Sequence, residues 1–258
     1  MADADLLYER RGPAAVITFN RPQARNAMTF AMYEDLYARC EEIDADDDVR
    51  VAVLRGAGGR AFVSGTDIRQ FLDFDSGRTG VEYEAEIDRY VGRVDRLRKP
   101  SIALVEGYAV GAGLAISAAC DLRVCTPDAQ FGLPIARTLG NCLSMAGYAR
   151  LVAILGEART KDIVFTARMV GADEALAAGL VSAVVANDEI EEHVLGLAER
   201  VAGHAPITLR VTKEALRRIR EANVPDGADL VEEAYGSEDF RQGVAAFLEK
   251  RRRAWTGR

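Results

Sequence analysis

SIALVEGYAVGAGLAISAACD, residues 101–121, combines a strand, a turn and a helix in one short segment. The apolar run Ser101–Val105 predicts a β-strand, and the glycine-rich segment Glu106–Gly113 predicts a tight turn. Leu114–Cys120 then predicts a small-residue helix that stops at Asp121. The first N–H groups of a helix have no partner within it, and the helix dipole adds roughly half a positive charge there. This layout is typical of an anion-binding site.

Two glycines flank a potential hydrogen-bond donor in this turn. Gly111 and Gly113 have no Cβ, so a ligand can approach the backbone, where Ala112 would present its N–H. Taken alone, Gly-x-Gly in an alanine-rich stretch favours the simpler interpretation that the glycines only allow close packing.

A second segment of the sequence favours a binding role for this turn over a packing role. Residues 59–70, GRAFVSGTDIRQ, follow a predicted strand at Arg50–Leu54. Gly65 predicts a sharp bend, after which Thr66 has an available N–H. Two strand-to-turn segments that each end in a glycine-flanked N–H can aim both groups at one oxygen atom. That arrangement is the geometry of an oxyanion hole.

These two segments resemble the two signatures of the crotonase superfamily, the enoyl-CoA hydratase/isomerase family. AFVSGTDI is similar to AFxAGxDI, and EGYAVGAGLAISAACDL is similar to NGxAxGGGxxLAxxCD. The similarity extends in the same order over nearly the whole chain, at Asn20–Met28, Gln130–Pro134, Ala172–Val185, Ala205–Leu216 and Ala245–Arg251.

The resemblance implies an α/β fold, a spiral of ββα units followed by a C-terminal helical trimerisation region. We expect the spiral core over residues 1–195 and the helical region over 196–258. The pattern of strand, helix and strand near residues 14–54 agrees with an α/β class, although the residues themselves show no repeat. The protein is expected to be a homotrimer or a dimer of trimers.

The resemblance also implies a substrate and a site. The backbone N–H groups of Thr66 and Ala112 would hold the thioester carbonyl of an acyl-CoA, as in enzymes of fatty acid metabolism. Coenzyme A would be part of this substrate, and no permanently bound cofactor is expected. Four flanking residues are assigned to the binding site: Gly65, Asp67, Ile68 and Gly111. Of these, Asp67 is expected to have a structural role.

A net charge of −7 disfavours nucleic acid as a partner and requires local cations for the anionic CoA. The resemblance makes Lys250 the best candidate, with Arg25 and Lys213 as weaker ones. The basic run Lys250–Arg253 has a simpler interpretation, because cations at a helix C-terminus complement its dipole.

The chain departs from the family at both glutamates of a hydratase. The first falls at Ala115, and the second falls at Ile135 or Ala136, depending on where a one-residue insertion is placed. None of these side chains can transfer a proton. Hydrolysis, decarboxylation, isomerisation and a specialised hydration therefore remain open, as does an acyl-CoA-binding protein with little turnover.

The polar stretch 137–148 supplies candidate replacements. Asn141 and Ser144 are the catalytic candidates, and Ser144 aligns with the nucleophilic aspartate of a dehalogenase branch. More simply, Asn141 caps the next helix and Cys142 packs in the core. Other polar side chains here are Arg137, Thr138 and Tyr148.

The segment after the first signature predicts a loop and then a helix. The loop, 71–80, presents Phe71, Leu72 and Phe74 as a possible ligand cover. The helix, 81–98, has an apolar stripe, and its carboxylates at 82, 84, 86 and 88 are expected in solvent. In the family this helix borders the acyl pocket, so one carboxylate can face inward.

Composition excludes several classes of protein. No apolar run approaches the ~20 residues of a membrane span, and the acidic start is unlike a secretory or transit peptide. Neither the four cysteines nor the pair His193 and His204 show metal-ligand spacing, so no metal site is expected. These features favour a reducing cytoplasm, and the acidic charge balance disfavours RNA binding.

Overall fold

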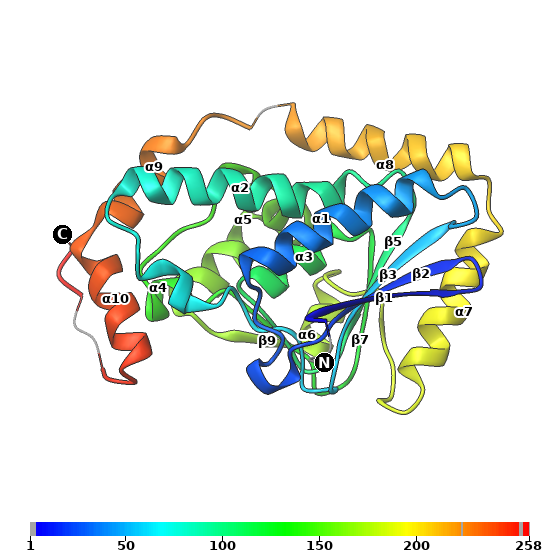
Figure 1. Ribbon diagram of the computed structural model, residues 1–258, viewed down its shortest axis with the longest axis horizontal. Coiled ribbons are helices and arrows are strands. Elements are labelled where there is room, and N and C mark those ends of the chain that lie inside the picture. Colours follow the sequence, from blue (N-terminus) through cyan, green and yellow to red (C-terminus); the bar gives the residue numbers. More distant parts are fainter. Residues whose placement is uncertain (1–3, 223, 253–254, 258) are drawn as a thin grey trace.

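The computed structural model describes residues 4–222, 224–252 and 255–257, which form two β-sheets surrounded by helices (Figure 1). The larger sheet has the strand order β1-β2-β3-β5-β7-β10, and the smaller has the order β4-β6-β8-β9. Only the β1–β2 and β8–β9 pairs are antiparallel among the pairings of these sheets. The strands are β1 Leu6–Arg11, β2 Ala14–Phe19, β3 Val51–Gly56, β4 Ala61–Val63, β5 Ser101–Val105, β6 Tyr108–Val110, β7 Leu122–Cys125, β8 Gln130–Gly132, β9 Met169–Gly171 and β10 Ala183–Val184.

The order of strands along the chain produces a spiral of ββα units. In each of the pairs β3–β4, β5–β6 and β7–β8, the first strand joins the larger sheet and the second joins the smaller one. A helix follows each pair: α2, α3, and α4 with α5. The spiral predicted from the family resemblance is therefore visible in the topology, although no repeat is visible in the sequence.

Helices cover the sheets and extend beyond them. In Figure 1, α7 covers the strands at one end of the molecule, whereas α9 and α10 lie at the other end. The helices are η1 Pro22–Ala24, α1 Phe30–Ala45, η2 Ile68–Phe71, α2 Gly77–Asp95, α3 Ala112–Ala119, α4 Ile135–Thr138, α5 Met145–Thr166, α6 Ala172–Ala177, α7 Ile190–Ala202, α8 Pro206–Glu221, α9 Ala228–Gly236 and α10 Glu238–Leu248.

The predicted strands are largely confirmed, and two helices start at capping side chains. Ser101–Val105 is a strand with every residue buried, as a continuous apolar run in a parallel sheet predicts. Thr29 caps α1 by accepting a hydrogen bond from the Met32 N–H, and Ser237 caps α10 by accepting one from Phe240.

Several boundaries differ from the prediction. The presumed turn 106–113 contains strand β6, and α3 begins at Ala112 because Gly111, with φ of 57°, ends the strand directly before it. The expected division near residue 195 falls inside α7, which packs on the larger sheet. Helix α10 ends at Leu248, so Lys250 lies beyond it, and Arg253 lies outside the described residues.

Membrane and metal features are missing from the described part of the chain. None of the helices described in residues 4–222, 224–252 and 255–257 is both long and apolar enough to cross a bilayer. The same residues contain no group of three histidine, cysteine or acidic side chains placed to hold a metal ion.

The contact between α3 and β4 depends on Gly113. A Cβ at this position would lie 1.9 Å from the Val63 carbonyl oxygen, a backbone atom that cannot rotate away. We expect Gly113→Ala to lower the free energy of unfolding by about 3 kcal/mol, which chemical denaturation measures. Gly196→Ala is the control: no atom lies within 4 Å of its Cβ position inside α7, so this variant should be neutral or slightly more stable. Equal stabilities of the two variants would contradict the packing described.

Candidate active site

A cavity of about 530 Å³ lies where η2, α2, α4 and α10 meet the N-terminus of α3. Its lining is mainly apolar and includes Phe247 and Leu248 of α10. Both segments singled out in the sequence reach it, because Gly65, Thr66, Gly111 and Ala112 are lining residues. The cavity therefore brings together the two predicted backbone donors.

The Thr66 N–H has no acceptor among the described residues, because Thr66 is the central residue on its side of an isolated β-bridge. Met28 pairs with Thr66 in parallel, but the hydrogen bonds run to the two flanking residues. The Met28 N–H donates to the Gly65 carbonyl at 2.9 Å, and the Asp67 N–H donates to the Met28 carbonyl at 2.8 Å. In such a bridge the N–H of the central residue points away from the partner strand. Thr66 thus directs its N–H to the side opposite Met28.

The Ala112 N–H also has no acceptor among the described residues, because Ala112 is at the start of a helix. Ala112 is the first residue of α3, where an N–H has no acceptor within the helix. The preceding Gly111 has φ of 57°, and its own N–H donates to the Gly132 carbonyl at 3.0 Å. A Cβ on Gly111 would lie 3.6 Å from Cα of Gly65, so the two donor segments are in direct contact.

Three hydroxyl groups form a cluster centred on Thr66. Its Oγ1 lies 2.9 Å from the Tyr33 hydroxyl and 3.0 Å from the Tyr83 hydroxyl. Burial raises the pKa of both tyrosines above the usual value, so their hydroxyls stay protonated. Three hydroxyl protons serve only two bonds within this cluster, so one proton remains for another acceptor. All three residues line the cavity.

Asp67 has the structural role expected from the sequence. Its carboxylate pairs with Arg69 at 2.6 Å and with Arg21 at 3.4 Å, and it caps η2. Hydrogen bonding to Arg69 lowers the pKa of Asp67 to about 2. The carboxylate is therefore ionised at neutral pH and does not exchange protons there.

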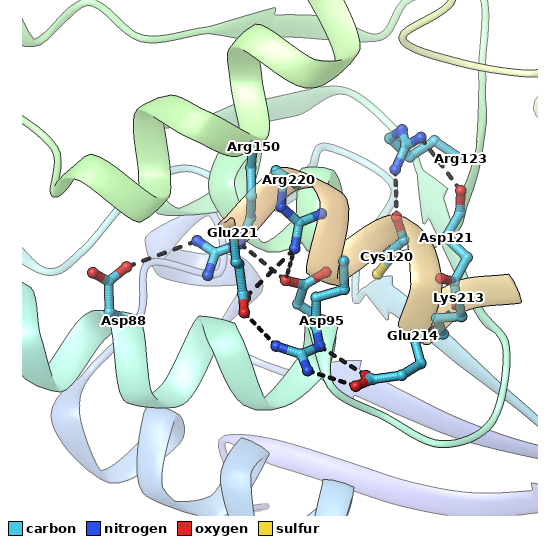
Figure 2. A network of polar contacts seen from close by, with 11 residues as sticks. Asp88, Asp95, Cys120, Asp121, Arg123, Arg150, Lys213, Glu214, Arg220 and Glu221 are labelled. Carbon is cyan, nitrogen blue, oxygen red and sulfur yellow. Dashed lines mark hydrogen bonds and ion pairs between the residues drawn. The ribbon is translucent and has the colours of Figure 1, made fainter. Parts of the chain in front are cut away.

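The cationic candidates for CoA binding differ in whether they line the cavity. Arg25 lines the cavity together with the predicted Ile68 and with Arg69, which no sequence motif marks. Lys213 lies elsewhere: its ammonium pairs with Asp121 at 2.6 Å, within the network shown in Figure 2.

Lys250 is also outside the set of residues that line the cavity, although Phe247 and Leu248, just before it in the chain, belong to that set. Its side chain is exposed. A contact between Lys250 and CoA phosphates stays a prediction, and so does one from Lys213, which is outside the cavity lining and is paired with Asp121.

Two of the positions that the family resemblance assigns to the hydratase glutamates lie at the cavity wall. Ala115 and Ile135 both line it, whereas Ala136 is exposed and does not. Of the two positions that the sequence leaves open for the second glutamate, Ile135 therefore matches the wall. Both sites present alkyl side chains to a bound molecule.

The polar stretch 137–148 contributes unequally. Asn141 lines the cavity and donates from Nδ2 to the Tyr235 hydroxyl at 3.2 Å. The helix cap is Ser144 rather than Asn141, because the Ser144 Oγ accepts from the Gly147 N–H at 3.0 Å. Ser144 is buried and lies outside the cavity lining, and Cys142 packs on α9.

The expected loop cover is only partly formed. Phe71 and Phe74 pack in an aromatic cluster with Tyr83, at centroid distances of 5.0 and 5.5 Å from it. Phe71 lines the cavity, but Leu72 is 61% exposed and lies outside the lining. The loop is also shorter than predicted, because α2 starts at Gly77.

Glu84 is a cavity residue, although the charge pattern of its helix predicts a position in solvent. The residue is 6% exposed and lines the cavity. Oε1 accepts a hydrogen bond from the Tyr235 hydroxyl at 2.6 Å, and Oε2 accepts one from the Ser144 N–H at 2.9 Å. Burial raises its pKa to about 7. The available signal was helical spacing, since Ile87 and Val91 follow Glu84 on the same face of α2.

Comparison with known proteins agrees with this geometry. The family model described as enoyl-CoA hydratase/isomerase matches residues 9–258. A probable enoyl-CoA hydratase from Rhizobium meliloti is 37% identical over 98% of both chains. A short-chain-enoyl-CoA hydratase from Clostridium acetobutylicum is 32% identical over 96% of both. Among solved structures, methylmalonyl-CoA decarboxylase in complex with 2-nitronate-propionyl-CoA has a TM-score of 0.90 and 28% identity over the full length of both chains.

The match to the family covers almost the entire chain, and the structural similarity includes every ββα unit of the spiral. The predicted fold and the predicted family are thus confirmed together. This chain belongs to the enoyl-CoA hydratase/isomerase family and has the crotonase fold.

Proposed function

We propose that the protein transforms an acyl-CoA thioester by stabilising its enolate in an oxyanion hole made of the Thr66 and Ala112 N–H groups. The observation that carries this proposal is that Thr66 and Ala112, whose N–H groups have no acceptor among the described residues, line one cavity on two segments that are in contact. A thioester oxygen gains negative charge when the α-carbon loses a substituent, and preorganised donors stabilise that charge. One such donor contributes roughly 3–4 kcal/mol to the transition state.

Coenzyme A enters as part of the substrate and not as a resident cofactor. Arg25 at the cavity supplies positive charge for its phosphates on a chain whose net charge is −7, whereas the guanidinium of Arg69 is paired with Asp67. The apolar wall suits an acyl chain. No nucleic acid is required by any of these features.

The reaction differs from standard hydration because the wall at Ala115 and Ile135 cannot activate water. Decarboxylation is the second candidate, since loss of CO₂ forms the enolate without a base at these positions. The structural similarity to a methylmalonyl-CoA decarboxylase supports including it. Thioester hydrolysis and acyl-CoA binding with little turnover are the third and fourth candidates.

A panel of acyl-CoA thioesters tests the proposal. Enoyl-, saturated and carboxyacyl-CoA substrates are incubated with the protein, and products are identified by mass spectrometry while binding is measured by calorimetry. We expect binding and turnover of at least one class. Binding without turnover would favour an acyl-CoA-binding protein, and absence of both would contradict the proposed function.

We also propose that α8 joins subunits into a trimer or a dimer of trimers. Lys213 and Arg220 of α8 face the body of their own subunit, where they pair with Asp121 and Asp95 (Figure 2). Several apolar side chains of the same helix are exposed instead: Ile207, Val211, Leu216 and Ile219. A helix that directs some of its charged side chains into its own subunit and leaves apolar side chains exposed is typical of a subunit contact.

Light scattering tests this assembly. We expect the mass of three or six chains at micromolar concentration, and a shift toward one chain when Ile207, Leu216 and Ile219 are changed to serine, since burial of these side chains drives association. Changing the exposed Phe165 of α5 to serine is the matched control and should leave the mass unchanged. A monomeric wild-type protein would contradict the proposal.

A further inference from the structure

We propose that Glu84 is the residue that exchanges a proton with the α-carbon of the bound acyl group. This inference rests on the proposed function, because it assigns the proton transfer that a thioester enolate requires. The geometry comes from three elements: α2 carries Glu84, α9 carries Tyr235, and the start of α5 supplies the Ser144 N–H.

The Glu84 carboxylate is held by hydrogen bonds but can accept more of them. Each of its oxygens accepts one hydrogen bond, from Tyr235 and Ser144 respectively, whereas a carboxylate oxygen can accept about two. The side chain is nevertheless part of the cavity lining. Such a group keeps a fixed orientation and retains the capacity to bind or release a proton at the cavity.

Glu84 differs in this respect from the other carboxylate of the cavity. Among the described lining residues, the acidic side chains are Asp67 and Glu84. Asp67 is paired with Arg69 and stays ionised. The hydrogen bonds of Glu84 come instead from an uncharged hydroxyl and a backbone N–H, so both of its protonation states are accessible near neutral pH.

The groups around Glu84 account for this behaviour. Burial is the main cause of its raised pKa, and Asp88 on the next turn of α2 raises it further. The Tyr235 hydroxyl and the Ser144 N–H act in the opposite direction. Asp88 in turn pairs with Arg150 at 3.8 Å. The remaining titratable neighbours are kept neutral by burial, which raises the pKa of each: Tyr33, Tyr83, Cys142, Tyr148 and Tyr235.

The proposed step is a reversible proton transfer. Ionised Glu84 takes the proton from Cα, the C–H electron pair moves into the enolate, and the oxygen charge is held by the Thr66 and Ala112 N–H groups. In the reverse direction protonated Glu84 donates to Cα, and the enolate returns to the thioester. The second direction also completes a decarboxylation, in which the electron pair comes from the bond to CO₂.

A purely structural role would mean that Glu84 only ties α2, α5 and α9 together. Such a role predicts loss of folding or binding on mutation, without a change in the pH dependence of chemistry. Tyr235 would then matter only for packing. A measurement of proton exchange at Cα separates the two roles because it reports the chemical step itself.

The experiment follows deuterium uptake at Cα of butyryl-CoA in D₂O by mass spectrometry, across pH, with the full-length protein. In the wild type the exchange rate should rise with pH and level off above a midpoint near 7, because the ionised form of Glu84 is the base. Glu84→Gln should lower the rate roughly 10²–10⁴-fold while butyryl-CoA still binds. Glu82→Gln is the matched control, since Glu82 lies on the same helix outside the cavity lining, and its rate should equal that of the wild type.

Tyr235→Phe provides a second, milder variant. It removes the hydroxyl that stabilises the charged carboxylate, so the midpoint of the pH profile should move upward while exchange persists. Tyr235 is a positioning residue in this account. An unchanged midpoint in this variant would contradict the hydrogen-bonded role.

Exchange by Glu84→Gln at the wild-type rate would overturn the assignment of Glu84 and leave the proposed function intact. Loss of butyryl-CoA binding or of the far-UV circular dichroism spectrum in that variant, together with an unshifted Tyr235→Phe profile, would establish the structural role instead. A wild-type protein that neither binds acyl-CoA nor exchanges the α-proton would overturn both proposals.

Discussion

Ala112→Pro should lower turnover of acyl-CoA thioesters by about 10²–10³-fold or more, because proline has no N–H to donate to the thioester oxygen. Proline is sterically compatible with position 112. Ala112 is the first residue of α3, where proline is well tolerated, and the glycine before it relaxes the restriction that proline imposes on its predecessor. The loss is measured as kcat/KM on the best substrate of the acyl-CoA panel.

Two variants control for this result. Ala112→Gly keeps the N–H and should retain most of the activity, and the proline variant must keep the wild-type oligomeric mass and circular dichroism spectrum. Thr66→Ala keeps the second N–H but removes the hydroxyl bonded to Tyr33 and Tyr83. Activity of a folded Ala112→Pro protein at the wild-type level would contradict the oxyanion hole, and inactivity of Thr66→Ala would give its hydroxyl a catalytic role.

Hydration of crotonyl-CoA should be very slow even though CoA thioesters bind. Ala115 and Ile135 line the cavity where a hydratase places its two glutamates according to the family resemblance. Because Glu84 is proposed to protonate the α-carbon, the role left without a group at Ala115 and Ile135 is the activation of water. One missing acid or base lowers the rate roughly 10²–10⁴-fold, so we expect a kcat lower by that factor than that of a hydratase with both glutamates. Loss of the crotonyl-CoA absorbance at saturating substrate measures this rate.

An active hydratase of the same family, assayed in parallel, shows that the substrate and conditions are adequate. Ala115→Glu places a carboxyl group at one of the two wall positions and is the informative gain-of-function variant. A wild-type kcat comparable to that of the active hydratase would contradict the assignment of Ala115 and Ile135 as the replaced glutamates.

Single strands and helix starts were predictable because their signals are local. The mostly apolar run 101–105 specifies a buried parallel strand, and Thr29 and Ser237 mark helix starts by side chains that accept backbone hydrogen bonds. The spiral was accessible only through family resemblance, since it arises from which sheet each strand joins. Boundaries such as the start of α3 depend on single backbone angles that no residue pattern specifies.

The site was predictable in its backbone groups but not in its ionisable ones. Glycines mark Thr66 and Ala112 from sequence alone. Glu84 looks like one of several carboxylates on a charged helix, and its inward direction depends on Tyr235, far away in the sequence. Lys213 was a weaker candidate for contact with CoA, and its ammonium pairs with Asp121 outside the cavity lining. Helical spacing indicates that Glu84 shares the inner face of α2 with Ile87 and Val91, but spacing along the chain does not reveal the tertiary partners that fix such long side chains.

A crystal structure of the protein with bound butyryl-CoA tests the central claim most directly. The account predicts that the thioester carbonyl oxygen lies within about 2.7–3.2 Å of the backbone nitrogens of both Thr66 and Ala112, with the acyl chain in the cavity beside Glu84. A thioester oxygen that contacts neither nitrogen, or an acyl group bound outside this cavity, would contradict it.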